Sequence, residues 1–324
     1  MIDHVPATQR IPVIDLAGSF SSNLAERKAV AAEIHAASRD IGFFYVKNHG
    51  IPAAMTAAQL ELAHEFFALE MSEKLEIDVK QSSCFRGYEP LAVQTLEEGK
   101  SPDLKEGFIM GPDLGPDHRY VRAGVPNTGP NQWPRHPHDF KQRMNAYSAR
   151  MTDLGRHLIA CLALSLELPE DYFAASLEEP IAYCRLLHYP PQSAATAAQN
   201  LGAGAHTDWG MLTMLLQDDI GGLEVRAPDG EWISATPMPG TFVVNLGEMI
   251  PRLTNDLYRS TMHRVVSNTS GRDRYSVPAF LDPEYYYTVK CVPTCLPTDG
   301  SPRYPECSVG EHLAEMYRKT YNLA

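Results

Sequence analysis

The residues whose types and spacing most clearly suggest chemistry lie in the segment AGAHTDWGMLTMLLQDD, residues 203–219. It places His206 and Asp208 two positions apart, directly after a glycine-rich stretch. In extended backbone, side chains at positions i and i+2 point to the same face, so both residues could bind one metal ion. A His-x-Asp motif also arises by chance, so the prediction needs a third ligand and a scaffold that brings it near.

The best candidate for the third ligand is His263 in the segment STMHRVVS, which we expect to open a later strand. Two imidazoles and one carboxylate on one face of an ion are typical of non-haem Fe(II) oxygenases and leave other coordination positions open. Structural zinc sites instead favour closed sets of Cys and His ligands. Other histidines compete for the third position, and we interpret His136 and His138 as surface residues.

A second chemical feature follows eleven positions after His263, where Arg274 and Ser276 are again two apart. On a strand both side chains would face the same side. A planar guanidinium binds a carboxylate through two hydrogen bonds, and a neighbouring hydroxyl adds a third. A buried arginine needs an anionic partner, because an unpaired buried charge is costly. The alternative is an internal salt bridge to an Asp or Glu.

The overall composition excludes some classes of function. The 324 residues carry a net charge of −12, whereas nucleic-acid binding needs a basic surface. No apolar run approaches the ~18 residues of a membrane span, and the N-terminus lacks a signal-peptide pattern. We therefore expect a cytoplasmic protein. Its six cysteines form no C-x-x-C pair and are expected as reduced thiols; zinc binding by Cys291, Cys295 and Cys307 is a disfavoured alternative.

The first half of the chain alternates short strands and helices. We predict strands at 11–16 and 42–51 and helices at 24–39 and 53–70. Residues 81–135 are rich in Gly and Pro and are expected to form a long irregular segment, which in compact domains is often functional. From Phe140, apolar residues recur at spacings of three and four, which predicts an amphipathic helix of about 28 residues.

The second half is a series of short strands separated by turn signals. We predict strands at 182–189, 211–217, 222–228, 231–237, 241–247, 262–267 and 275–282, with Asp229-Gly230 as a hairpin turn. The expected fold is α+β and mainly β, a double-stranded β-helix (jelly roll) with N-terminal and supporting helices. Residues 1–135 would form an N-terminal region with substrate-lid loops, and 136–324 the support helix and the core, packed as one compact unit.

Many ordered segments resemble the isopenicillin-N-synthase-like branch of the Fe(II)/2-oxoglutarate oxygenases. In the first half these are IPVIDL, GFFYVKNHGI, RGYEP, DLKEGFIMG and NQWP. In the second half they are CRLLHYPP, AHTDWGMLTMLLQDDIGGLEV, DGEWISATPMPGTFVVNLGEMI, TNDLYRSTMHRVV and RYSVPAFLDP. The resemblance covers nearly the whole chain.

The resemblance implies a 2-oxoglutarate-dependent dioxygenase that hydroxylates, desaturates or cyclises a small metabolite and releases succinate and CO₂. It implies an Fe(II) site made by His206, Asp208 and His263. It also implies a site for the distal carboxylate of 2-oxoglutarate made by Arg274, Ser276 and Tyr189. O₂ is the oxidant and ascorbate a candidate reductant. The partner is a small-molecule substrate, and the oligomeric state is left open.

Two residues depart from the family pattern, and the chemistry is not limited to one function. Glu248 stands where the family often has Asp, and Leu187 stands where plant members often have Asn. Some oxidases of the family keep the Arg-x-Ser pair and bind a substrate carboxylate without 2-oxoglutarate. The same residues would also fit a Zn²⁺-dependent hydrolase or a non-catalytic barrel that binds a carboxylate.

Substrate contacts are predicted from the loop segment and the strand after Arg274. Phe280 occupies a position where relatives often place an aromatic ring against substrate. Arg86 and Tyr88 lie in a segment that resembles the family's pocket lid, although Arg86 could instead pair with Glu89.

Three further residues are expected to be structural rather than functional. Trp209 follows Asp208 and would point away from the ligands if the strand is regular, which favours core packing. Lys105 and Glu106 are expected to pair with each other.

Overall fold

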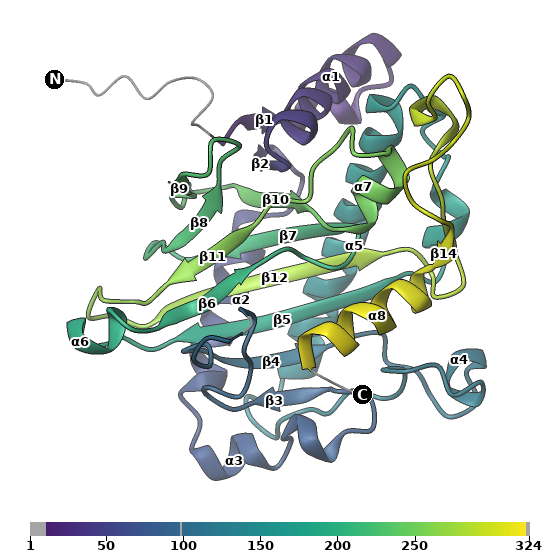
Figure 1. The fold of residues 1–324 in the computed structure, drawn as a ribbon. Coiled ribbons are helices and arrows are strands. Elements are labelled where there is room, and N and C mark those ends of the chain that lie inside the picture. Colours follow the sequence, from purple (N-terminus) through teal and green to yellow (C-terminus); the bar gives the residue numbers. More distant parts are fainter. Residues whose placement is uncertain (1–10, 98, 322–324) are drawn as a thin grey trace, which may run out of the picture.

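A computed structural model describes residues 11–97 and 99–321 of the protein (Figure 1). Its framework is the larger of two facing sheets. The N-terminus, which lacks a signal-peptide pattern, lies mostly outside the described residues. The larger sheet has the strand order β1-β2-β10-β7-β12-β5-β4-β3. Its strands are β1 (Val13–Asp15), β2 (Phe43–Lys47), β3 (Gly87–Glu89), β4 (Glu106–Met110), β5 (Ile181–Tyr189), β7 (Leu212–Gln217), β10 (Phe242–Leu246) and β12 (Arg274–Asp282).

The smaller sheet has the order β6-β11-β8-β9 and lies in front of the larger one in Figure 1. Its strands are β6 (Leu201–His206), β8 (Leu223–Arg226), β9 (Trp232–Ser234) and β11 (His263–Val266). Asp229-Gly230 forms the predicted turn between β8 and β9, which pair antiparallel. A separate two-stranded sheet joins β13 (Thr288–Val289) to β14 (Cys307–Ser308). The two facing sheets confirm the predicted mixed α and β fold with a jelly-roll core.

Helices cover the outer face of the larger sheet. Helix α5 contacts β5, β7 and β12 and runs behind them in Figure 1, while α1 packs against α5. The helices are α1 (Leu24–Asp40), α2 (Ala53–Phe67), α3 (Met71–Leu75), α4 (Arg119–Arg122), α5 (Phe140–Ser165), α6 (Ala194–Ala197), α7 (Met249–Thr254) and α8 (Val309–Tyr321). None of the helices among the described residues is long and apolar enough to cross a membrane.

Five strands of the described residues were missed by the sequence prediction, namely β3, β4, β6, β13 and β14. The glycine-rich segment 201–206 is strand β6, and β3 and β4 lie inside the segment 81–135 that was expected to be irregular. Gly202 and Gly204 lower β propensity, but neighbouring side chains approach them closely, so the strand needs residues without a side chain there. Strands β3 and β4, from the first half of the chain, extend the same sheet as the strands of the second half.

The contact between α5 and the sheet leads to a stability prediction at Gly155. A Cβ atom at this position would lie 2.6 Å from Leu281 Cδ2 and 3.0 Å from Met214 Cε, and both of these side chains are buried. We expect Gly155→Ala to lower the free energy of unfolding in urea by about 1–2 kcal/mol, because overpacking outweighs the gain in helix propensity.

A matched control measures the propensity term on the same helix. Ala146 is exposed on α5, so Ala146→Gly should cost only the intrinsic ~1 kcal/mol. A Gly155→Ala protein that is more stable than the parent would contradict the close packing.

Candidate functional site

His206, Asp208 and His263 come together at one edge of the smaller sheet. His206 ends β6, His263 begins β11, and the two residues are paired across these antiparallel strands. Asp208 Oδ1 lies 3.8 Å from His206 Nε2 and 3.7 Å from His263 Nε2. Ligand atoms of all three lie within 4.8 Å of one another. The structure thus brings together the three ligands that the sequence predicted.

Backbone carbonyls fix the orientation of both imidazoles. The Nδ1–H of His206 donates to the Gly204 carbonyl at 2.7 Å, and the Nδ1–H of His263 donates to the Thr261 carbonyl at 3.1 Å. With Nδ1 carrying the proton, the lone pair of each Nε2 faces Asp208. This arrangement is the usual support of metal-binding histidines.

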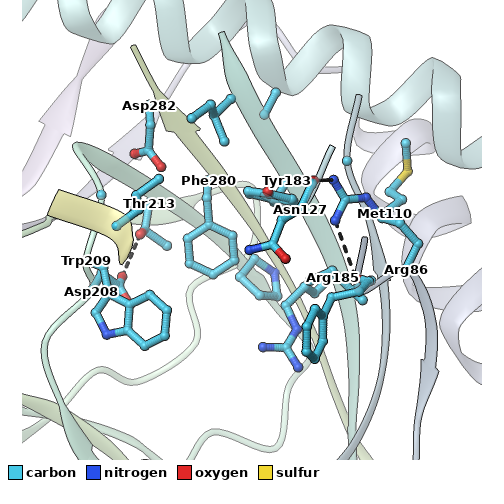
Figure 2. A pocket seen from close by; sticks show the side chains of 18 of the residues that line it. Arg86, Met110, Asn127, Tyr183, Arg185, Asp208, Trp209, Thr213, Phe280 and Asp282 are labelled. Carbon is cyan, nitrogen blue, oxygen red and sulfur yellow. Dashed lines mark hydrogen bonds between the residues drawn. The ribbon is translucent and has the colours of Figure 1, made fainter. Parts of the chain in front are cut away.

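The Asp208 carboxylate is held by one of its two oxygens. Oδ2 accepts hydrogen bonds from Thr213 Oγ1 at 2.5 Å and from Asn245 Nδ2 at 2.6 Å, and the first of these is the dashed line beside Asp208 in Figure 2. Oδ1 is therefore left on the side of the histidines. One carboxylate oxygen and two imidazole nitrogens then face a common point.

Electrostatics keep these groups in the protonation states that a metal needs. Burial, reinforced by the nearby His263, lowers the pKa of His206 to about 3. Burial acts to raise the pKa of Asp208, but the two imidazoles and the hydrogen bonds from Asn245 and Thr213 outweigh it and hold this pKa below its ordinary value. A neutral imidazole and an ionised carboxylate are the forms that bind a divalent cation.

The turn that carries Asp208 is tied to the end of β10. The Glu248 amide donates to the Asp208 carbonyl at 2.8 Å, and Thr207 Oγ1 donates to Glu248 Oε1 at 2.5 Å. A Cβ atom at Gly247 would lie 2.2 Å from the Gly210 carbonyl oxygen, so this close approach requires glycine. The longer acid noted at position 248 thus fastens the turn and removes no ligand.

Trp209 differs from the sequence prediction. Strand β6 ends at His206 and the backbone bends at 209, so regular alternation does not apply there. Trp209 lines the cavity, and Figure 2 shows its ring beside Asp208. The His312 Nε2–H of α8 donates to the Trp209 carbonyl at 2.8 Å, which ties the C-terminal helix to this turn. The expectation of core packing for Trp209 was therefore wrong.

Arg274, Ser276 and Tyr189 lie together on the inner face of β12 and β5. Arg274 is paired with Tyr189 in the strand register, and its guanidinium lies 4.5 Å from the centre of the Tyr189 ring. Arg274 and Ser276 are each 1% exposed. Arg274 Nη2 donates to Gln217 Oε1 at 3.3 Å, whereas Nε and Nη1 are buried and have no hydrogen-bond partner among the described residues.

One cavity of about 890 Å³ connects the three ligands with this arginine. Phe280 and Arg86 also line it, as predicted for substrate contacts, and Figure 2 shows both with Trp209 around the same space. Tyr88 lies away from the cavity lining: it is fully buried and its hydroxyl donates to Glu106 at 2.5 Å. The structure therefore does not bring Tyr88 into the site.

The predicted ion pairs of the loop segment were wrong. Lys105 pairs with Asp103, and Glu106 pairs with Lys74 and His188, because neighbouring residues of an extended chain face opposite sides. Glu89 pairs with Arg185 instead of with Arg86. His136 and His138 are exposed, as expected.

Sequence reasoning missed the two residues that hold Asp208. Asn245 and Thr213 are 3% and 5% exposed and lie on paired strands, directly opposite each other. The available signal was a polar residue inside each of two apolar strand patterns, because a buried polar side chain needs a partner. Nothing in the spacing identified Asp208 as that partner.

The residues present fit a divalent metal beside an organic anion. Two imidazole nitrogens and one carboxylate oxygen converge, and no thiolate takes part, which suits non-haem Fe(II). The unpartnered donors of Arg274 mark the place of a buried negative group in the same cavity.

Comparisons with known proteins agree with this chemistry. Residues 11–136 match the family described as the non-haem dioxygenase in morphine synthesis N-terminal region, and residues 180–283 match the 2OG-Fe(II) oxygenase superfamily. The chain is 38% identical over 318 residues to the 2-oxoglutarate-Fe(II) type oxidoreductase hxnY of Emericella nidulans, covering 97% of this chain and 91% of the relative.

Two further similarities concern a plant enzyme and a solved structure. The chain is 38% identical over 284 residues to homoarginine-6-hydroxylase 2-ODD-233 of Oryza sativa, covering 86% of this chain and 85% of the relative. The crystal structure of a full-length Neurospora crassa protein in complex with alpha-KG and thymine superposes with a TM-score of 0.86 and 27% identity, covering 98% and 99% of the two chains.

The support of Asp208 gives a prediction for metal affinity. Thr213→Val keeps the shape of the side chain but removes the donor to Oδ2. We expect the Fe(II) affinity to fall about 10- to 100-fold, because residues that orient metal ligands contribute that much. Competition with a chromophoric chelator under anaerobic conditions measures it.

Thr152→Val is the matched control for that change. Thr152 also lines the cavity, but its hydroxyl donates to the Ser148 carbonyl within α5. Its Fe(II) affinity should equal that of the parent protein. Equal affinities for all three proteins would show that the hydroxyl of Thr213 does not support the metal site.

Proposed function

This chain belongs to the 2-oxoglutarate-Fe(II) oxygenase superfamily, and from that premise we propose that it oxidises a small-molecule metabolite bound in the 890 Å³ cavity. It is a 2-oxoglutarate-Fe(II) type oxidoreductase that uses Fe(II) and 2-oxoglutarate. The proposal assigns the metal to His206, Asp208 and His263. It assigns the distal carboxylate of 2-oxoglutarate to Arg274, Ser276 and Tyr189, and the reaction to hydroxylation, desaturation or cyclisation.

Each part of the chain has a separate task in this proposal. When bound, Fe(II) and 2-oxoglutarate supply the oxidising power, with O₂ consumed and succinate and CO₂ released. His206, Asp208 and His263 would hold the metal through two imidazole nitrogens and one carboxylate oxygen, and all three residues line the cavity. Arg274 orients the anion through charge-assisted hydrogen bonds, and the apolar wall around it excludes water.

The observation that best supports the proposed 2-oxoglutarate site is the environment of the Arg274 guanidinium. It is 1% exposed, and two of its three nitrogens are without a partner. It is held by the Gln217 amide and the Tyr189 ring rather than by a carboxylate. A buried guanidinium in this state is stabilised by an anion that enters from the cavity. An internal salt bridge is thereby disfavoured.

Two of the competing functions lose support. Membership of an oxygenase family argues against a zinc hydrolase, although two histidines and one carboxylate could also hold zinc. The converging ligands argue against a non-catalytic barrel. An oxidase that binds its substrate carboxylate at Arg274 is separated from our proposal by the titration below.

Relatives that share this family are associated with chemically different small molecules. The structure of one relative holds thymine, and another relative is named for homoarginine. For this chain we propose that Phe280, Trp209 and Arg86 contact the substrate, because all three line the cavity that also contains the metal ligands.

The test of the proposed function starts with an anaerobic titration. Adding 2-oxoglutarate to the Fe(II) protein should produce a visible charge-transfer band, and His206→Ala or His263→Ala should abolish it. Absence of the band in the parent protein, with Fe(II) bound, would refute the 2-oxoglutarate site.

Arg274→Met gives a prediction with two opposite effects. The affinity for 2-oxoglutarate should fall at least 100-fold, because a buried charge-assisted pair is lost. The ligand-free protein should melt at the same or a higher temperature, because an unpaired buried charge is removed.

Arg272→Met serves as the control for Arg274→Met. Arg272 is exposed and pairs with Asp219 at 3.0 Å, so both 2-oxoglutarate affinity and melting temperature should stay close to those of the parent. A strong loss of melting temperature in Arg274→Met alone would show that Arg274 is a structural residue rather than an anion site.

A further inference from the structure

Arg86 repeats, at the other end of the cavity, the features that distinguish Arg274. It is 1% exposed, and its guanidinium lies 4.7 Å from the centre of the Tyr183 ring. Its Nε is buried without a hydrogen-bond partner. Tyr183 and Tyr189 lie on the same strand, β5, six positions apart and on the same face. Each end of this strand thus presents a ring-stacked, buried arginine to the cavity.

The hydrogen bonds of Arg86 do not neutralise its charge. Nη1 donates to the carbonyls of Cys84 at 2.7 Å and Phe85 at 3.3 Å, and Nη2 donates to the Asn127 carbonyl at 2.8 Å. All three acceptors are neutral. Nε–H has no hydrogen-bond acceptor among the described residues, so it can donate to a carboxylate that enters the cavity.

The acidic residues that line the cavity are engaged elsewhere. Three of them form ion pairs with other cations, namely Glu89 with Arg185, Asp113 with Lys141 and Glu179 with Arg119. Asp282 accepts a hydrogen bond from the Met211 amide, and burial raises its pKa to about 7, so it is only partly ionised near neutral pH. Asp208 faces the two histidines. Arg86 therefore adds an uncompensated positive charge to this end of the cavity.

The strand register places the residues next to Arg86 and next to Asp208 on different strands. Phe280 is paired with Thr213 on one side and with Tyr183 on the other. Neighbouring strands are ~4.8 Å apart, so the backbone at Thr213, which holds Asp208, and the backbone at Tyr183, whose ring stacks on Arg86, are about 10 Å apart. Two strand spacings leave room for a single ring that bears a carboxylate. Phe280 lies between the two ends and Trp209 beside Asp208, and both offer aromatic faces (Figure 2).

We propose that Arg86 is the binding residue for a carboxylate of the primary substrate, which is therefore a small ring-containing organic acid oxidised at the end remote from that carboxylate. The proposal rests on the proposed function for the position of the metal. The Asn127 side chain, directed toward Phe280 in Figure 2, adds a polar group on the path between the two ends.

The test compares acids with their own amides in the protein saturated with Fe(II) and 2-oxoglutarate under anaerobic conditions. The probes are benzoate and benzamide, phenylacetate and phenylacetamide, and cyclohexanecarboxylate and cyclohexanecarboxamide, titrated by calorimetry. Saturation with 2-oxoglutarate blocks the Arg274 end. We expect at least one acid to bind ten times or more tightly than its amide, because a charge-assisted pair replaces a neutral hydrogen bond. If no acid binds more tightly than its amide, or none binds, the proposal is wrong.

Two variants connect this preference to Arg86. Arg86→Met should remove the preference for the acid and leave the affinity for 2-oxoglutarate unchanged. Gly111→Ala keeps the charge, but its Cβ would lie 2.5 Å from Arg86 Nη2 and 2.9 Å from Nε, so it should also reduce the preference. Gly115→Ala is the control, because a Cβ there meets nothing within 4 Å.

The outcomes separate this proposal from the proposed function. A 2-oxoglutarate band without any preference for acids overturns the carboxylate site alone. A preference for acids that depends on Arg86, without a 2-oxoglutarate band, supports the carboxylate site and overturns the proposed cosubstrate. If Arg86 only braces its loop, Arg86→Met lowers the melting temperature and changes the affinities for acid and amide by the same factor, which also overturns the proposal.

Discussion

The site depends on how the Asp208 carboxylate is divided between the protein and the cavity. Oδ2 takes both protein donors, Thr213 and Asn245, and Oδ1 is left facing the two imidazoles. Burial without donors or neighbouring positive groups favours the protonated form of a carboxyl, which binds a metal poorly. The two imidazoles, together with the two hydrogen bonds to Oδ2, lower the pKa of Asp208 and keep it ionised, and Oδ1 stays available to a metal.

This division depends on the register of two pairs of strands. Thr213 and Asn245 are opposite each other across β7 and β10, and His206 and His263 are opposite each other across β6 and β11. A slip of one residue in either pair would turn the side chains to the other face of the sheet. The Gly247 contact with Gly210 and the Glu248 hydrogen bonds then connect the two sheets at the turn. The two histidines are thus positioned by strand pairing, and Asp208 by a turn that is tied to the end of β10.

The parts of this arrangement that follow local patterns could be predicted from the sequence. The strands that carry His263 and Arg274 are short runs of strand-forming residues between turn signals, and the apolar stripe from Phe140 predicted helix α5. Strand β6 could not be predicted, because Gly202 and Gly204 are selected by close neighbours rather than by β propensity. The direction of Trp209 and the partners of Lys105 depend on where a strand ends, and a sequence pattern locates strand ends least well.

The arginines of the two stacked pairs, Arg274 with Tyr189 and Arg86 with Tyr183, lie in different kinds of segment. Arg274 lies on β12 between regular strands, so its position is fixed by the same pairing that positions the metal ligands. Arg86 precedes the short strand β3 in the segment 81–135, and it is held by carbonyls of Cys84, Phe85 and Asn127. Segments of this kind tolerate sequence change better than the strands they cover. A change in which substrate binds at the Arg86 end of the cavity therefore requires no change in the strand register that holds Asp208. The same scaffold can keep its oxidative chemistry while the acid-binding end changes with the loops.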